Sequence, residues 1–575
     1  MSIASTNDST DNNEPLVSDT SVTALLSTPS RYDNIPLSGV IRFVGRGETL
    51  SQLHQLLQAN NQVAIVGIPG VGKTELALQY TRQYIEDYPG GVCWLLGNTG
   101  DVGLHLVEFT RRHFPTFRLP DGLTSQEQVE HCWQHWQISR GETEITEKVL
   151  VVLDEVTDYQ QVEPYLPPPS SPFKVLMTTR FKESLPAQQQ LFLDVLSPDA
   201  ALELLAARIG KDRIKNTRGK GFVTNTTRRE KKPEVITPTV AEQLCEWLGC
   251  LPLGLELVGR YLEQEPNLSL ERMLSRLQKQ RLLQPETEPM ENVTAQREVA
   301  AAFELSWKRL DADTQELACL LSIFALNLMP WEQVESVLGQ QYLPGALLGQ
   351  LLNPSQEDAE AEIESLIETL KAEWEKRQAV LLRLHLLQRT DESTYQLHPL
   401  IRELVREKLE QLEQADNLRQ IFCQVMVAVA KQIPDSPTPE LIEAVRTAMP
   451  HVAETTTSLK EFLRDEDLFW PFYSLGNFYQ SQGFYNQAES WFEQCLLVTR
   501  DRLGEVHIEV ATSLNNLAGL YASLGRSSEA EPLYMQALEI FEQLLGVEHP
   551  DTVTIRKNLE LFRQQQQSYV TPSPA

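Results

Sequence analysis

One stretch of this 575-residue sequence decides its fold: Gly67-Ile68-Pro69-Gly70-Val71-Gly72-Lys73-Thr74. It fits the pattern G-x-x-x-x-G-K-[ST] at every position, and it stands between an apolar run at 63–66 and a helical pattern at 75–87. In that context the glycines let backbone N–H groups turn inward around phosphate oxygens, and the following helix adds the positive end of its dipole. The stretch therefore predicts a phosphate-binding loop (P-loop) at the edge of a parallel α/β sheet.

Each chemical type in the loop has its own expected task. The lysine brings a positive charge to the β- and γ-phosphates, and the threonine offers a hydroxyl to Mg²⁺, which keeps most of its other ligands as water and phosphate. The backbone of the remaining positions cradles the phosphate oxygens. The residues expected to bind a nucleotide and its metal ion here are Gly67, Gly70, Val71, Gly72, Lys73 and Thr74.

Polar side chains follow two other apolar runs. Three further runs predict buried parallel strands: 91–96, 149–153 and 174–179. Asp154 and Glu155 end the second run, and Arg180 ends the third. Because strand ends meet at one sheet edge, we expect Asp154 to reach Mg²⁺ through water and Glu155 to orient or activate the attacking water. Arg180 is expected to sense the γ-phosphate with its guanidinium fork, and the alternative is a plain surface arginine.

The C-terminal part of the chain contains an internal repeat with an offset of 42 residues, since 503–507 recurs as 545–549. Small and large apolar residues at the shared positions let two antiparallel helices close against each other, and glycines permit the tight turn between them. The pattern resembles the tetratricopeptide repeat in a longer form. It predicts repeats at about 469–500 and 511–545, followed by a capping helix from 553.

The P-loop motif, the helical patterns, an apparent wing at 386–398 and the repeats predict a multidomain fold: an α/β P-loop NTPase domain, then helical, winged-helix and all-α repeat domains. The predicted parts are a disordered tail over 1–40, the P-loop α/β domain over 41–197, a helical domain over 198–294, a winged-helix domain over 295–410, a helical linker over 411–465 and the repeats over 466–575. The segment 211–232 holds nine Lys/Arg and two Asp/Glu. A solvated surface loop is favoured there over a specific anion-binding arm.

Several short motifs, in this order, resemble those of NB-ARC ATPases, a group that includes apoptosome proteins, plant disease-resistance proteins and bacterial relatives within the STAND class. Phe43-Val44-Gly45-Arg46 resembles the family's entry motif, and Thr178-Thr179-Arg180 its sensor. Gly249-Cys250-Leu251-Pro252-Leu253 is similar to its G-L-P-L motif. The stretch 303–310 resembles the start of its winged-helix domain, and Leu397-His398-Pro399 stands where the family has Met-His-Asp.

The resemblance implies roles for four residues outside the loop. Val44 and Arg46 would line the adenine side, Pro252 would pack on the adenine, and His398 would reach the β-phosphate of ADP and lock a closed state. The resemblance also implies a cycle in which ADP holds the modules closed, a ligand on the repeats loosens them, ATP enters and the open form oligomerises. The implied cofactors are ADP/ATP and Mg²⁺. The implied partners are a protein or peptide ligand and further copies of the chain.

The composition of the whole chain narrows the expected cellular location and the expected classes of binding partner. The net charge of −29 disfavours nucleic acid and anionic lipid unless a local basic patch intervenes. The seven cysteines are scattered without a CxxC pair, which is typical of reduced thiols. No apolar run approaches a bilayer span, and the N-terminus has no signal-peptide pattern, so a cytoplasmic location is expected. The range 466–575 carries fourteen Asp/Glu against six Lys/Arg, which favours a basic protein partner.

Two other functions stay open beside an ATP-dependent switch that works as a slow ATPase. A winged-helix transcription regulator is disfavoured because 397–410 mixes basic with acidic residues, whereas a DNA-reading helix is normally more basic. A metabolic P-loop enzyme is disfavoured by the repeats and by the lack of a small-substrate motif. A metal site at His131, Cys132 and His135 is conceivable, since the two histidines would share a helix face, but it is disfavoured because no second ligand pair lies nearby in the sequence.

Overall fold

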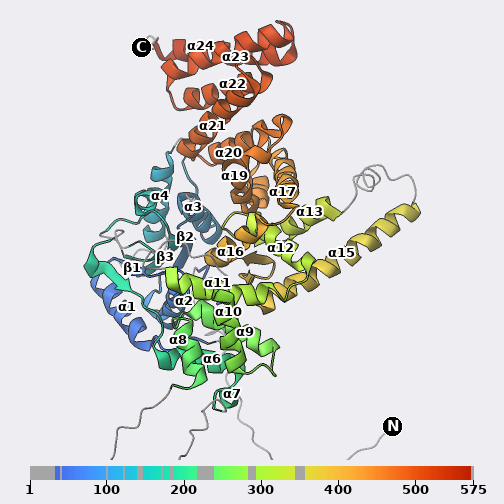
Figure 1. Cartoon of the computed structure of the whole chain (residues 1–575). Coiled ribbons are helices and arrows are strands. Elements are labelled where there is room, and N and C mark those ends of the chain that lie inside the picture. The colour runs from blue at the N-terminus through green and yellow to red at the C-terminus, as the bar shows by residue number, and fades with distance from the viewer. Residues whose placement is uncertain are drawn as a thin grey trace, which may run out of the picture.

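The computed structural model describes most of the chain (Figure 1). The described residues are 33–38, 42–98, 102–120, 123–138, 147–169, 172–181, 185–215, 238–282, 293–342 and 357–570, with backbone only at 293–296, 357–364 and 567–570. Most of the predicted tail 1–40 and of the basic loop 211–232 therefore lies outside the described residues. Within the described ranges, no helix combines the length and the apolar character that crossing a bilayer requires.

A five-stranded parallel sheet forms the first domain, in the order β2-β3-β4-β1-β5. Its strands are β1 (Gln62–Val66), β2 (Val92–Leu96), β3 (Val149–Val156), β4 (Phe173–Thr179) and β5 (Gln190–Phe192). The four strands predicted from apolar runs are confirmed, because runs of Val, Ile and Leu suit strands that are buried on both faces. The fifth was not predicted, since three residues are too few to show a period.

Five helices accompany this sheet. They are α1 (Gly47–Ala59), α2 (Lys73–Gln83), α3 (Val102–His113), α4 (Ser125–Ile138) and α5 (Tyr159–Val162). Cys132 on α4 is fully buried, while His131 and His135 lie against the ring of Phe117 at centroid distances of 5.7 and 4.9 Å. No group of three or more His, Cys, Asp or Glu among the described residues could hold a metal ion. Cys132 and the rings of His131 and His135 thus pack within the first domain.

A helical region follows the sheet. It contains α6 (Pro198–Ile209), α7 (Lys211–Lys215), α8 (Val240–Trp247), α9 (Pro252–Gln264) and α10 (Leu270–Leu282). Helix α6 packs along α9, and the buried Arg208 joins them by donating from Nε and Nη2 to Glu256 at 2.9 and 2.6 Å. Gly249 and Cys250 have φ angles of 61° and 51°, so the chain turns sharply before Pro252 starts α9.

The next region combines helices with a small sheet. It contains α11 (Val293–Trp307), α12 (Ala312–Ile323), β6 (Met329–Pro330), α13 (Trp331–Tyr342), α15 (Glu357–Arg383), β7 (Gln388–Arg389), β8 (Thr394–Gln396) and α16 (Pro399–Leu409). The strands pair antiparallel in the order β6-β8-β7, so the hairpin expected of a wing is present. Figure 1 shows α15 projecting from the body, in agreement with the exposed helix that its polar pattern indicates.

The C-terminal part is all helical. It contains α17 (Ala415–Ala430), α18 (Pro439–Val445), α19 (Met449–Thr457), α20 (Phe469–Ser481), α21 (Tyr485–Leu503), α22 (Ile508–Ser523), α23 (Ser527–Leu545) and α24 (Pro550–Val570). Helices α21 and α23 have 19 residues each and end at glycines with φ of 87° and 85°. The predicted pair of repeats and the following helix are confirmed.

The first repeat and the linker contact the P-loop domain. Gln128 on α4 donates from Nε2 to the carbonyl oxygen of Gln482 at 3.0 Å, and Gln487 on α21 lies 3.3 Å from the hydroxyl of Tyr165. Arg446, in the 3-10 turn after α18, forms an ion pair with Glu108 on α3. Figure 1 shows the same arrangement, with α20 and α21 next to α3 and α4. The first repeat and the linker are therefore packed on the P-loop domain in this conformation.

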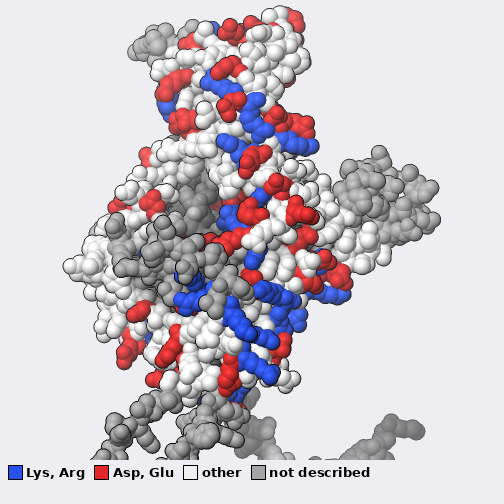
Figure 2. Space-filling view, viewed as in Figure 1, with Lys and Arg blue, Asp and Glu red and all other residues white. Residues whose placement is uncertain are grey.

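Charge is unevenly spread despite the net value of −29. On the face shown in Figure 2, Lys and Arg gather where Figure 1 places α9, α10 and α15, while both signs mix over the linker and repeats. Helix α10 alone carries four Lys/Arg and one Glu. Lys and Arg are therefore locally clustered on this face although the chain as a whole is acidic.

Candidate functional site

The P-loop connects the end of β1 to the start of α2. Gly70 and Gly72 have φ angles of 76° and 96°, which favour glycine. Helix α2 starts at Lys73 after Gly72, and no side chain caps this start in the part of the chain that the structure describes. The first-turn N–H groups of a helix have no partner within the helix, so here they can receive phosphate oxygens.

Lys73 is held over the loop itself. Its Nζ donates to the carbonyl oxygens of Gly67 at 2.9 Å and Ile68 at 3.0 Å. Burial, and next the charge of Arg180, lower the pKa of Lys73 to about 8, while Glu155 and Asp154 oppose the change. A phosphate group would stabilise the charged ammonium by supplying the opposite charge.

Asp154 is tied to two hydroxyl groups at the end of β3. Thr74 Oγ1 donates to Asp154 Oδ1 at 2.9 Å, and Thr178 Oγ1 donates to the same oxygen at 2.5 Å. Burial raises the pKa of Asp154, and the two hydroxyls and Lys73 oppose this rise. The donor set consists of hydroxyl and carboxylate oxygens, which are the ligands that Mg²⁺ prefers. The residues present therefore fit a magnesium ion held by Thr74 and, through water, by Asp154.

Glu155 adopts an uncommon backbone conformation for a residue other than glycine, with φ of 61°. Its N–H donates to Thr178 Oγ1 at 2.8 Å, and its Oε2 accepts from Nδ2 of Asn98 at 2.9 Å. Burial, and then the neighbouring charge of Asp154, raise the pKa of Glu155 to about 7. A carboxylate with a pKa near neutrality suits a group that accepts a proton from water.

The start of α9 rests directly on the P-loop. The Leu253 N–H donates to the carbonyl oxygen of Gly70 at 3.3 Å, and a Cβ added at Gly70 would lie 3.1 Å from Leu253. Pro252, the first residue of α9, lies beside Gly72. This contact brings the helical region to the edge of the phosphate site.

His398 precedes α16 and faces the loop from another direction. Its Nδ1 accepts the Leu400 N–H at 3.2 Å and caps the helix, so the proton of the neutral ring is on Nε2. Burial, and then the charges of Lys73 and Arg180, lower the pKa of His398 to about 4. Pro399, the departure from the family pattern, occupies the first helical position, where proline is favoured.

Val44 and Arg46 of the entry motif line the same cavity as the P-loop. Val44 is buried, and Arg46 donates from Nη2 to the carbonyl oxygen of Asp194 at 2.6 Å. Burial lowers the pKa of Arg46, and Asp194 opposes this change. Gly45, with φ of 68°, lies so close to α6 that an added Cβ would be 2.2 Å from the Cβ of Ala200.

One cavity of about 980 Å³ is lined by nearly all the predicted site residues. Those that line it are Val44, Arg46, Gly70, Val71, Gly72, Lys73, Thr74, Asp154, Glu155, Arg180, Pro252 and His398. Gly67 is not among the lining residues, and its carbonyl oxygen instead holds Lys73. Sequence reasoning missed Asn98 and Arg402, which also line the cavity. A signal existed for Asn98, because it follows an apolar strand as Asp154 does.

Part of the predicted disordered tail also borders the cavity, and for 33–38 that prediction is corrected. Asp33 bridges to Val92, and the carboxamide of Asn34 both donates to the Trp94 carbonyl at 2.8 Å and accepts its N–H at 2.7 Å. The amide side chain thus reproduces the two hydrogen bonds of a neighbouring strand. Composition alone does not reveal such edge pairing.

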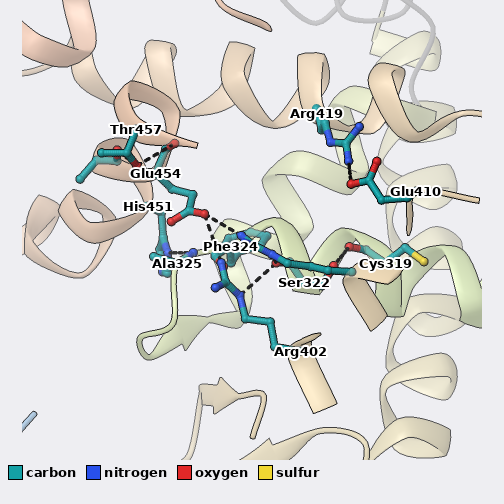
Figure 3. Close-up of polar contacts among 12 residues, drawn as sticks. Cys319, Ser322, Phe324, Ala325, Arg402, Glu410, Arg419, His451, Glu454 and Thr457 are labelled. Carbon is teal, nitrogen blue, oxygen red and sulfur yellow. Dashed lines mark hydrogen bonds and ion pairs between the residues drawn. The ribbon is translucent and has the colours of Figure 1, made fainter. Parts of the chain in front are cut away.

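Arg402 links the cavity wall to the linker helices (Figure 3). Its Nε donates to the Ser322 carbonyl at 3.1 Å, its Nη2 donates to the Phe324 carbonyl, and the same Nη2 lies 3.3 Å from Glu454 on α19. His451 on α19 accepts the Ala325 N–H at 3.2 Å. Helix α16 is thereby fastened to α12 and α19, and α19 packs on α20 of the first repeat.

Comparisons with known proteins agree with this layout. Residues 47–215 match the model of the NB-ARC domain, and residues 467–543 match the model of the tetratricopeptide repeat. None of the curated proteins matches the chain. The predicted resemblance is therefore confirmed for these two parts, and the chain carries an NB-ARC domain joined to tetratricopeptide repeats.

Solved structures resemble the chain only distantly. A signal transduction ATPase with numerous domains (STAND) that has a tetratricopeptide repeat sensor, from Pyrococcus horikoshii, is 16% identical, covers 91% of this chain and 71% of its own, and has a TM-score of 0.41. Cdc6p from Pyrobaculum aerophilum is 12% identical, with coverages of 65% and 100% and a TM-score of 0.29. A Walker-type ATPase of Pyrococcus abyssi is 13% identical, with coverages of 64% and 99% and a TM-score of 0.26. At these TM-scores, none of the three supports an argument about function.

Proposed function

We propose that this chain, an NB-ARC domain joined to tetratricopeptide repeats, is a signalling switch that alternates between ADP and ATP. One observation carries the proposal: the cavity beside the P-loop is walled by three separate regions, namely the loop and its sheet, the start of α9, and the start of α16. A nucleotide in such a cavity contacts all three regions together. A change of nucleotide therefore changes the free energy that holds the regions together.

The closed state would be stabilised by contacts that an ADP molecule makes with all three regions. Lys73 and the open start of α2 would bind its phosphates, while Pro252 would pack on the base beside Val44 and Arg46. His398 would donate from Nε2 to the β-phosphate, because its Nδ1 is occupied by the Leu400 N–H. This single hydrogen bond would connect α16 to the nucleotide.

Hydrolysis would return the ATP form to the closed form. Glu155 would orient the attacking water and accept its proton, and Arg180 would stabilise the γ-phosphate charge. When bound, Mg²⁺ supplies positive charge to the phosphate oxygens. Thr74 would hold that ion through its hydroxyl and Asp154 would hold it through water. We expect slow turnover, because a switch needs long-lived states.

The repeats would act as the sensor, and the open form would oligomerise. They form a helical surface with fourteen Asp/Glu and six Lys/Arg over 466–575, which fits a basic protein or peptide. The first repeat touches the P-loop domain at Gln128 and Tyr165, so a ligand that moves it would disturb that domain. Exposure of the P-loop domain would then allow further copies of the chain to associate.

The proposal is tested by purifying the full chain, identifying its bound nucleotide, and measuring its mass by light scattering after size exclusion with ADP or with ATP and Mg²⁺. We expect a monomer with ADP and larger species with ATP. A chain that binds neither nucleotide would exclude the switch. Multiple fast turnovers on a small acceptor would favour a metabolic enzyme. Salt-resistant binding of DNA would favour a transcription regulator.

A further inference from the structure

Asn98 makes a contact that the proposed reaction does not use. It follows β2 and donates from Nδ2 to Oε2 of Glu155 at 2.9 Å. The amide nitrogen must face Glu155, because a carboxylate can only accept. The Oδ1 of Asn98 is buried and has no hydrogen-bond partner among the described residues. The Asn98 carboxamide is therefore oriented to make one interaction, the hydrogen bond to Glu155. It makes this bond although its buried Oδ1 has no hydrogen-bond partner among the described residues.

The order of the strands shows toward which side of β3 this contact draws the Glu155 side chain. The P-loop follows β1, and the sheet runs β2-β3-β4-β1-β5, so β2 and the loop lie on opposite sides of β3. Glu155 stands at the end of β3, where the Leu96↔Asp154 pairing brings the end of β2 alongside. A hydrogen bond to Asn98 therefore draws the Glu155 carboxylate toward β2 and away from the edge where the γ-phosphate would lie.

The backbone at Glu155 is also held by surrounding contacts. Its φ of 61° is sparsely populated by residues other than glycine and persists only where neighbouring contacts impose it. Thr178 accepts its N–H at 2.8 Å, and Asn98 binds its side chain. Gly97, directly before Asn98, packs so closely that an added Cβ would lie 2.6 Å from Val156. A small movement of the end of β2 would thus act directly on Glu155.

We propose that Asn98 is a positioning residue that holds Glu155 on the β2 side of its strand, out of line with the water that attacks the γ-phosphate. The inference rests on the proposed function, since it assigns Glu155 the task of orienting that water. The added element is the hydrogen bond between Asn98 and Glu155, which restrains Glu155 and keeps ATP hydrolysis slow while the first repeat is packed on the P-loop domain. Removing the Asn98 side chain should therefore release Glu155 and accelerate hydrolysis.

The same restraint connects to the repeats. Helix α3, the next described element after Asn98, carries Glu108, which forms an ion pair with Arg446 of the linker. Helix α3 packs on α4, whose Gln128 holds the carbonyl oxygen of Gln482 in the first repeat. A partner that displaces the first repeat or the linker would shift α3 and α4. The end of β2 would follow, and Asn98 would lose its hold on Glu155.

The test compares Asn98→Ala and Asn98→Leu with the wild type, using ATP hydrolysis by the full chain with Mg²⁺. Leucine has nearly the same shape as asparagine but no donor, so it covers the case in which alanine weakens the fold. We expect kcat to rise about tenfold, the lower end of what a hydrogen bond to a charged group contributes, with little change in KM. Asn60→Ala serves as the control, because the Asn60 side chain donates to the Leu56 carbonyl at the end of α1, away from Glu155.

Two double variants distinguish a positioning role of Asn98 from a general effect of the substitution on the structure. In a Glu155→Gln background, Asn98→Ala should no longer change kcat, since its effect acts through Glu155. Arg446→Ala should raise kcat in the wild type and add little to Asn98→Ala, because both act on one restraint. A fall in kcat, an unchanged kcat in both Asn98 variants, or additive effects would overturn the Asn98 proposal alone. A wild-type chain that binds no nucleotide would overturn the proposed function as well.

Discussion

The two walls of the nucleotide cavity differ in how they are made. The near wall consists of the P-loop and the ends of β3 and β4, which one sheet holds in register. Its parts are already joined, since Asp154 accepts hydrogen bonds from both Thr74 and Thr178. The far wall consists of Pro252 and His398, which reach the loop only because separate helical regions pack against it. The near wall should therefore decide whether a nucleotide binds, and the far wall what binding does to the rest of the chain.

The largest effect is expected at the near wall. Lys73→Ala should lower the affinity for ADP and ATP about a thousandfold, because the phosphates lose a partly buried charge partner. Isothermal titration calorimetry measures this change. Lys174→Ala is the matched control, since Lys174 lies at the start of β4 and donates to the Asn60 carbonyl, away from the loop. Equal affinities for Lys73→Ala and the wild type would remove the P-loop assignment.

Within the near wall, the two carboxylates should separate binding from chemistry. Asp154→Ala should weaken Mg²⁺-dependent binding of ATP, because the water-mediated ligand is lost. Glu155→Gln should bind ATP as the wild type does but hydrolyse it about a hundredfold more slowly, the usual contribution of a positioned general base. Calorimetry with and without Mg²⁺ and a phosphate-release assay measure the two effects. Hydrolysis at the wild-type rate by Glu155→Gln would exclude Glu155 as the group that orients water.

At the far wall, His398→Ala should lower ADP affinity about ten- to hundredfold, because a hydrogen bond to a charged group contributes about 1.5–3 kcal/mol. It should also produce larger species with ATP at lower protein concentration. His507→Ala is a close control: His507 caps α22 through Nδ1 with an N–H at 3.2 Å, as His398 caps α16, but it lies in the repeats. If both variants behave alike in light scattering and ADP titration, His398 is only a helix cap.

The smallest effect is expected where the first repeat meets the P-loop domain. A Cβ at Gly483 would lie 2.1 Å from Nε2 of Gln128, so Gly483→Ala should expel that side chain and break its bond to Gln482. One hydrogen bond of about 1 kcal/mol corresponds to about fivefold faster ADP release. Gly525, 42 residues later, has a similar φ of 72°, and no atom of the described residues lies within 4 Å of an added Cβ there.

Gly525→Ala therefore shares the backbone cost of Gly483→Ala, about 1–2 kcal/mol of folding stability, without touching the P-loop domain. Stopped-flow release of a fluorescent ADP analogue compares the two variants. Equal release rates would mean that this contact does not restrain the nucleotide site.

Sequence alone predicted the near wall well, and the reason is physical. The P-loop is contiguous, and Asp154, Glu155 and Arg180 each end an apolar strand, so strand pairing brings them to one edge without further information. Pro252 and His398 came only from resemblance to a family. Asn98 and Arg402 were not predicted as site residues. Asn98 does follow an apolar strand, but no local pattern marks Glu155 as its partner, and none marks the groups that Arg402 meets across the fold. The short extended segment 33–38 was taken as part of a tail because its pairing with Trp94 runs through a side chain.

The sequence by itself determined the elements whose partners lie nearby in the chain. These are the loop with its glycines, the apolar parallel strands, and the helix pairs whose 42-residue repeat places small residues opposite large ones. Only the tertiary structure decided which distant groups share the cavity, such as His398 near Lys73 and Arg180, or Asn98 on Glu155. Those contacts depend on how whole regions pack. Packing is the sum of many weak, non-local interactions, and short stretches of sequence do not record it.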